Sequence, residues 1–95
     1  MIERHVTFNV LPGRVQEFEE YFVQRYRPAM AETQGFVRAE LLRYTEDTTK
    51  LQMVLRFESL EAAAAWRNSE AHQALKPGLK ALYDVSELKV YDVLA

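Results

Sequence analysis

The sequence predicts an α+β fold of the ferredoxin-like type, a four-stranded antiparallel sheet with its helices on one face. Apolar residues alternate with period two in four segments, and they recur every three or four residues in the segments between. The order of these segments is β-α-β-β-α-β, which is the ferredoxin-like order. The length of 95 residues allows one domain, so residues 1–95 are treated as a single domain.

The first strand is predicted at Ile2–Val10 from its period-two alternation and its β-branched residues. One side of this strand carries Ile2, Arg4, Val6, Phe8 and Val10, and the other side carries Glu3, His5, Thr7 and Asn9. The turn residues Leu11-Pro12-Gly13 end it.

A helix is predicted from Arg14 to about Glu32. Its apolar face carries Val15, Phe18, Phe22, Tyr26 and Met30. Pro28 is expected to kink or interrupt this helix, because proline lacks the donor and clashes with the preceding turn. Gly35 is expected to adopt the left-handed conformation where the chain leaves the helix.

A β-hairpin is predicted next. Its strands span Phe36–Tyr44 and Lys50–Glu58, joined by the polar turn 45–49. Strict alternation would place Phe36 on the same face as Arg38 and Leu42.

Two short helices and a last strand complete the chain. Ser59 is predicted as the N-cap of a helix over Leu60–Arg67, and Asn68-Ser69 as the start of a second helix over Glu70–Lys76. Pro77-Gly78 is expected to interrupt the second helix, and a further helical turn is expected at Leu79–Tyr83. The last strand is predicted at Val85–Leu94.

The composition excludes several classes of protein. Twelve basic residues are scattered among fourteen acidic ones, so no positive stripe for nucleic acid is present. No apolar run reaches the roughly 20 residues that a membrane span needs. The absence of cysteine, with no signal-peptide pattern at Met1–Arg14, predicts a cytoplasmic protein. Without cysteine and with only two histidines, any catalysis is expected to need no metal or other cofactor.

Apolar residues on both sides of several predicted strands favour a homodimer. Val54 opposes Met53 and Leu55, for example, whereas a sheet with one solvated face alternates more cleanly. We therefore expect a second copy of the chain to cover the sheet face that the helices leave open. A monomer with a few exposed apolar residues is the alternative.

The segment Trp66-x-x-Ser69-x-x-His72, together with the order of elements, resembles the antibiotic biosynthesis monooxygenase family. The resemblance implies a dimeric α+β barrel, in which two sheets pack face to face and each subunit holds a pocket between its sheet and its helices. It also implies oxygenase chemistry without a cofactor, on phenols and quinols.

The chain also departs from two branches of that family. The resemblance implies Asn and His where this chain has Val6 and Lys76, so haem degradation is not expected, because lysine is a poor axial ligand at neutral pH. In the cofactor-free branch the motif Asn, Trp, Tyr corresponds here to Ala62, Trp66 and His72. Only the tryptophan matches, and histidine is a plausible functional replacement for the tyrosine.

The family's geometry implies a pocket for a small aromatic ligand. Its candidate lining is Val6, Phe8, Phe22, Tyr26, Phe36, Met53, Trp66, His72 and Tyr83. Trp66 is expected to form a wall and donate a hydrogen bond, and His72 to accept a proton from the substrate. Each also has a structural alternative: Trp66 as a core anchor, and His72 as a helix residue bonded to Ser69 or a backbone carbonyl.

Two functions remain open at this point. The first is a cofactor-independent monooxygenase that acts on a small or polycyclic phenol or quinol. The second is a non-catalytic dimeric protein that binds a small molecule, which the missing Asn at position 62 favours.

Overall fold

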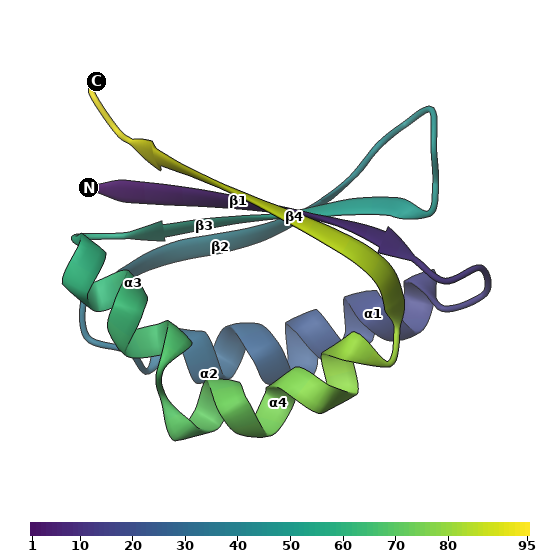
Figure 1. Ribbon diagram of the computed structural model, residues 1–95, viewed down its shortest axis with the longest axis horizontal. Coiled ribbons are helices and arrows are strands. Elements are labelled where there is room, and N and C mark those ends of the chain that lie inside the picture. The colour runs from purple at the N-terminus through teal and green to yellow at the C-terminus, as the bar shows by residue number, and fades with distance from the viewer.

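The computed structural model describes residues 1–95 and contains the predicted order of elements. The strands are β1 (Ile2–Val10), β2 (Phe36–Arg43), β3 (Lys50–Phe57) and β4 (Tyr83–Asp92). They form one antiparallel sheet in the order β2-β3-β1-β4, and all helices lie against one of its faces (Figure 1). The α+β, ferredoxin-like prediction is therefore confirmed.

The helical layer has two parts. The first is a continuous rod of α1 (Val15–Tyr21), the π-helical segment η1 (Phe22–Tyr26) and α2 (Arg27–Ala31). The second consists of α3 (Leu60–Arg67) and α4 (Glu70–Lys80), which follow each other with a sharp change of direction (Figure 1). None of these helices has the length and apolar character needed to cross a membrane.

The predicted interruption at Pro28 is wrong, because the first rod runs through the proline without a gap; the turn before it widens instead. The N–H of Arg27 donates to the carbonyl of Phe22, five residues back, just before the proline. Phe18, Phe22, Tyr26 and Met30 are spaced by four residues, which in a regular α-helix rotates each by about 40° past the one before. The wider turn reduces this drift, and all four side chains are buried.

A bulge in β2 places Phe36 on the opposite face of the sheet from the one predicted. Phe36 pairs with Phe57 while Arg38 pairs with Arg56, so Val37 is an extra residue in the ladder. Phe36 therefore packs against the core on the helix side, as Ala39 does further along the strand. Strict alternation would have placed Phe36 with Arg38 on the open face.

The predicted interruption at Pro77-Gly78 is wrong, because α4 continues through both residues to Lys80. Leu75 and Leu79 lie on either side of the proline and are both buried, because four residues of continuous helix place them on the same face. Gly78 leaves space for Tyr21, whose hydroxyl donates to the carbonyl of Leu75 at 2.8 Å. Tertiary packing thus outweighs the local cost of the proline.

Both predicted serine caps are confirmed. The Ser59 hydroxyl accepts a hydrogen bond from the N–H of Ala62 at 3.1 Å, and the Ser69 hydroxyl accepts one from the N–H of His72 at 3.0 Å. These caps determine where α3 and α4 begin.

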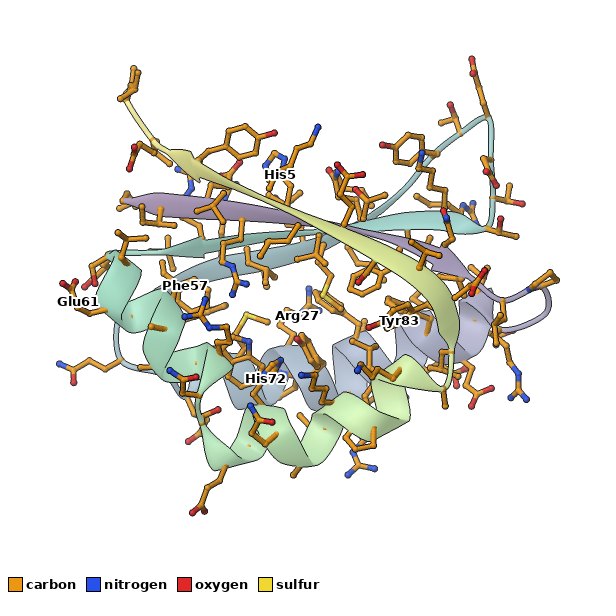
Figure 2. All side chains as sticks on the ribbon, in the orientation of Figure 1. His5, Arg27, Phe57, Glu61, His72 and Tyr83 are labelled. Carbon is orange, nitrogen blue, oxygen red and sulfur yellow. The ribbon has the colours of Figure 1, made fainter.

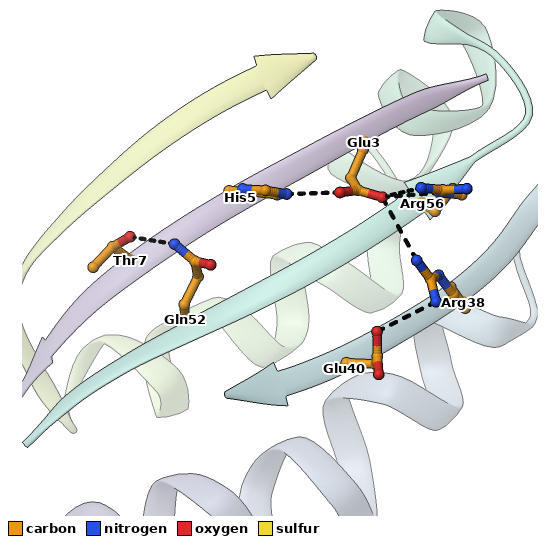
Figure 3. Close-up of polar contacts among 7 residues, drawn as sticks. All are labelled: Glu3, His5, Thr7, Arg38, Glu40, Gln52 and Arg56. Atoms are coloured by element: carbon orange, nitrogen blue, oxygen red, sulfur yellow. Dashed lines mark hydrogen bonds and ion pairs between the residues drawn. The ribbon is translucent and has the colours of Figure 1, made fainter. Parts of the chain in front are cut away.

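The open face of the sheet carries a charged network centred on Glu3 (Figure 3). The Glu3 carboxylate accepts hydrogen bonds from His5 Nε2 at 2.8 Å and from Arg56 Nε at 2.9 Å. Arg38 lies 3.9 Å from the same carboxylate and 3.5 Å from Glu40. The hydrogen bonds from His5 and Arg56 lower the pKa of the Glu3 carboxyl below its usual range.

Apolar side chains are interspersed with the charged ones on this face. They come from β2, β3, β4 and the hairpin turn, and they are Leu42, Tyr44, Val54, Val85 and Tyr91. The apolar residues of β4 are thus divided between the two faces: Leu88 lies on the helix side, but is 45% exposed because β4 is an edge strand. The open face is therefore more polar than the sequence pattern indicated.

Substitution of Gly35 by alanine tests how closely the loop before β2 contacts α3. Gly35 has φ +88°, and a Cβ there would lie 2.6 Å from the Cβ of Ala62. We expect Gly35→Ala to lower the free energy of unfolding by about 3 kcal/mol, from backbone strain and overpacking together. Gly13→Ala is the control, because Gly13 has φ +80° and no neighbour within 4 Å, so about 1 kcal/mol is expected. Equal losses in urea denaturation would contradict this account.

Candidate functional site

A cavity of about 150 Å³ lies between the sheet and the helices. Strands β1, β3 and β4 form one side of it, and η1, α3 and α4 form the other. Fourteen residues line it: Arg4, Val6, Phe8, Tyr26, Met53, Leu55, Trp66, Arg67, His72, Lys76, Leu79, Tyr83, Ser86 and Leu88. No acidic side chain belongs to this lining.

The structure brings seven of the nine predicted lining residues to this cavity: Val6, Phe8, Tyr26, Met53, Trp66, His72 and Tyr83. Two lie elsewhere. Phe22 faces a different hollow between the first helical rod and β2, because it precedes Tyr26 by a full turn. Phe36 packs edge-on against Phe57, with ring centroids 6.0 Å apart, because the β2 bulge turns it into the core beyond the cavity.

Three rings form the inner wall of the cavity. The Trp66 indole lies 5.4 Å from the Tyr26 ring at 89° and 4.9 Å from the His72 ring at 55°. Tyr26 and His72 are 5.9 Å apart. Trp66 is almost completely buried, so it is a core anchor and a cavity wall at the same time.

The tautomer of His72 follows from its one ring hydrogen bond. Nδ1 lies 2.9 Å from the carbonyl oxygen of Arg67, and a carbonyl can only accept. Nδ1 therefore carries the proton, which leaves Nε2 as an unprotonated acceptor in the neutral ring. The structural alternative, a bond to a backbone carbonyl, is thus present, and it prepares the other nitrogen to accept a proton. Figure 2 shows His72 and Tyr83 between the sheet and the helices.

The environment lowers the pKa of one titratable wall residue and raises that of another. Burial lowers the pKa of His72 below 6.5, and the positive charges of Lys76, Arg4 and Arg67 act in the same direction, against the hydrogen bond to the Arg67 carbonyl. Burial raises the pKa of Tyr26 to about 12, although the nearby Trp66 side chain and the Arg4 charge oppose this. At neutral pH His72 is therefore a neutral base and Tyr26 a neutral hydrogen-bond donor.

Sequence reasoning missed three basic residues at this site, Arg4, Arg67 and Lys76, which we call the cationic rim. A signal for each was present. Arg4 shares the strand side of Val6 in the period-two pattern, Arg67 follows Trp66, and Lys76 lies one helical turn after His72. Strand β1 and helices α3 and α4 bring them to one opening only in the folded chain.

Ala62, which stands where the resemblance implies an asparagine, does not line the cavity. Its buried methyl group packs against Gly35. This position therefore supplies no polar group to the site.

Two larger hollows lie elsewhere on the molecule. One of about 330 Å³ is on the open face of the sheet and is lined mainly by polar side chains such as Thr7, Gln52 and Lys89. The other, of about 340 Å³, lies between the first helical rod and β2. Neither contains a histidine beside buried aromatic rings. No three histidine or acidic side chains come together as a possible metal site.

Nitrogen-detected NMR of His72 tests the proposed tautomer and pKa. We expect a protonated Nδ1, an unprotonated Nε2 and a pKa below 6.5 in the unaltered protein. Lys76→Met is expected to raise the pKa of His72, because it removes one of the neighbouring positive charges. Lys80→Met, the same charge change at an exposed position of α4, is expected to leave it unchanged. A pKa at or above 6.5 before substitution would contradict the assignment.

Solved structures of other proteins have the same fold as this chain. Among solved structures, SnoaB from Streptomyces nogalater, a cofactor-independent oxygenase solved in a mutant form, is 24% identical with a TM-score of 0.88, over 97% of this chain and 91% of its own. A conserved protein from Methanosarcina mazei Go1 is 19% identical with a TM-score of 0.86, over 95% and 89% of the two chains. These likenesses show a shared fold.

The sequence comparisons identify the family. No curated sequence matches the chain significantly. The family model for antibiotic biosynthesis monooxygenases matches residues 1–77, which is most of the chain and includes both Trp66 and His72. The resemblance inferred from the sequence is thereby confirmed, and the chain belongs to the antibiotic biosynthesis monooxygenase family.

Proposed function

We propose that the protein is a monooxygenase that needs no cofactor and oxidises a small phenol or quinol in the cavity beside Trp66. The observation that carries this proposal is His72, a neutral imidazole with a free Nε2 in a largely apolar, aromatic cavity. The family supports it, as does the fold shared with SnoaB, a cofactor-independent oxygenase.

The reaction obtains its electrons from the substrate. For the simplest case, a phenol with a free para position reacts with O₂ to give a para-quinone and water. The phenolic O–H and the para C–H are lost, one oxygen atom becomes the new carbonyl, and the other leaves as water. The four electrons that O₂ accepts all come from the ring, so no external reductant is needed.

The cavity residues have distinct roles in this scheme. Nε2 of His72 accepts the phenolic proton, which produces an electron-rich phenolate that O₂ can oxidise. The Tyr26 hydroxyl stays protonated and can donate to a substrate oxygen. Trp66 supplies a flat wall that orients the ring, and the apolar lining excludes water from the anion.

The volume of the cavity limits the size of the substrate. A cavity of about 150 Å³ in another protein holds one benzene molecule. The cavity here has the same volume, about 150 Å³, so we propose a single-ring substrate in place of the polycyclic one that the family resemblance also allowed.

The second function, binding without catalysis, is supported by Ala62, which supplies no polar group to the cavity. The two functions differ in one measurable respect. A catalyst consumes O₂ with its bound phenol, whereas a binding protein retains the ligand unchanged.

Replacement of His72 is the direct test of the proposed base. We expect His72→Ala to lower oxygen uptake with a panel of single-ring quinols at least tenfold, because the proton acceptor is removed. Gln73→Ala is the matched control: Gln73 also donates to the carbonyl of Arg67, at 3.0 Å, but does not line the cavity. Unchanged uptake in His72→Ala would refute the role of His72. Tight binding with no uptake in the unaltered protein would support the binding function instead.

We propose further that the open sheet face is the surface of a homodimer. The apolar side chains Leu42, Tyr44, Val85 and Tyr91 are 42–54% exposed on this face, beside the Glu3 network, whose charged groups are already paired within the chain. A second copy would bury these apolar groups without leaving a buried, unpaired charge at Glu3, because Glu3 keeps its partners within the chain.

Leu42→Lys tests this assembly. We expect sedimentation at micromolar concentration to show a species of twice 11.1 kDa, and Leu42→Lys to shift it toward 11.1 kDa, because an unpaired charge would be buried at the interface. Leu60→Lys is the control, since Leu60 is 63% exposed on α3, in the helical layer. A single 11.1 kDa species for the unaltered protein would reject the dimer.

A further inference from the structure

The cationic rim of the cavity lacks a countercharge within the chain. Arg4, Arg67 and Lys76 take part in none of the ion pairs of the structure, and their side chains make no hydrogen bonds to the protein. Of the six arginines outside the rim, three form ion pairs: Arg14, Arg38 and Arg56. The lining of the cavity also contains no carboxylate.

Arg4 is the least exposed residue of the rim. It is half-buried on β1, between the ladder partners Leu55 and Val90, which are both apolar. Burial lowers the pKa of Arg4, and the neighbouring charge of Arg67 lowers it further. No buried side-chain nitrogen of the chain lacks a hydrogen-bond partner, so the guanidinium nitrogens of Arg4 reach the solvent-accessible part of the cavity. Arg4 therefore presents a partly desolvated charge that a ligand anion can pair.

The rim and the aromatic wall belong to the same cavity. Trp66 and Tyr26 form the buried end, while Arg67 and Lys76 are exposed at the opening. A ligand that fills this space therefore needs an aromatic ring at one end and a negative charge at the other. The net charge of the chain is -2, so the positive rim is a local feature and not the result of a basic protein.

We propose that the cavity binds a single-ring aromatic carboxylate, with its ring against Trp66 and its carboxylate at the cationic rim. This inference rests on the proposed function for the location of the site, and it names the class of substrate. Guanidinium groups match the geometry of a carboxylate, which makes Arg4 and Arg67 suitable partners.

A carboxylate fits the rim better than a neutral phenol does. A phenol becomes charged only when His72 takes its proton, so the resting complex would provide no anionic partner for the three cations. A carboxylate is already ionised at neutral pH. Its charge also offsets the cations that disfavour the imidazolium of His72, so the bound substrate would strengthen the base that deprotonates its own hydroxyl group.

Benzoate and benzamide are suitable probes, because they have the same shape, differ in charge and are inert to oxygen. We expect benzoate to bind at least tenfold more tightly than benzamide by calorimetry at low ionic strength. Quenching of tryptophan fluorescence should report the same event, because Trp66 is the only tryptophan of the chain. Benzoate, but not benzamide, should also raise the pKa of His72 in NMR titrations.

Charge variants assign the binding to the rim. Arg4→Met, which keeps the apolar stem, and Arg67→Gln, at an exposed position, are each expected to weaken benzoate binding at least fivefold and to leave benzamide binding within twofold. Lys80→Gln removes the same charge from an exposed site on α4 outside the cavity and should change neither. Arg67→Gln keeps the test informative even if Arg4→Met impairs folding.

Three outcomes would overturn the inference. They are equal affinity for benzoate and benzamide, no binding of either, and benzoate binding that the Arg4 and Arg67 variants do not alter. Oxygen uptake with a neutral quinol in any of these cases would leave the proposed oxygenase function intact and reject only the anionic substrate. If binding depends on the charge of the ligand but no dihydroxybenzoate causes O₂ uptake, the oxygenase function is rejected and the carboxylate site is retained.

Discussion

The candidate site depends on the hydrogen-bonded turn that joins α3 to α4. The hydroxyl of Ser69 donates to the carbonyl of Trp66 at 2.7 Å and accepts from the N–H of His72 at 3.0 Å. His72 returns a bond from Nδ1 to the carbonyl of Arg67. The burial of Trp66 anchors this turn to the sheet, so the indole and the imidazole keep their relative positions through local bonds. A shift of the turn would move the wall and the base together.

The two sides of the sheet use charge in opposite ways. On the open side Glu3 is bound by His5 and Arg56, so each charge of this network has a partner (Figure 3). On the helix side the cationic rim has none, and burial together with the neighbouring positive charges lowers the pKa of His72 and of Arg4. A paired network is suited to a packed surface, whereas an unpaired one beside a cavity is suited to a ligand.

Much of the fold was predictable from local rules. Period-two segments identified all four strands, serine caps marked the starts of α3 and α4, and Gly35 has the left-handed conformation that its position predicts. The failures share a cause. The β2 bulge at Val37 and the unbroken α4 across Pro77 both depend on what the segment packs against, which local propensity does not contain. The bulge also explains why Phe36, a candidate for the site, lies in the core.

The sequence by itself determined the family, the order of elements and the pairing of Trp66 with His72, because these depend on residue types at short spacing. Only the folded structure showed that Nδ1 of His72 is bonded to the carbonyl of Arg67, which leaves Nε2 free, and only the tertiary structure decided which charges surround the ring. Arg4, Arg67 and Lys76 are separated by up to 72 positions along the chain. The packing of α3 and α4 against the sheet brings these residues to the opening of one cavity. No short-period sequence pattern predicts this proximity.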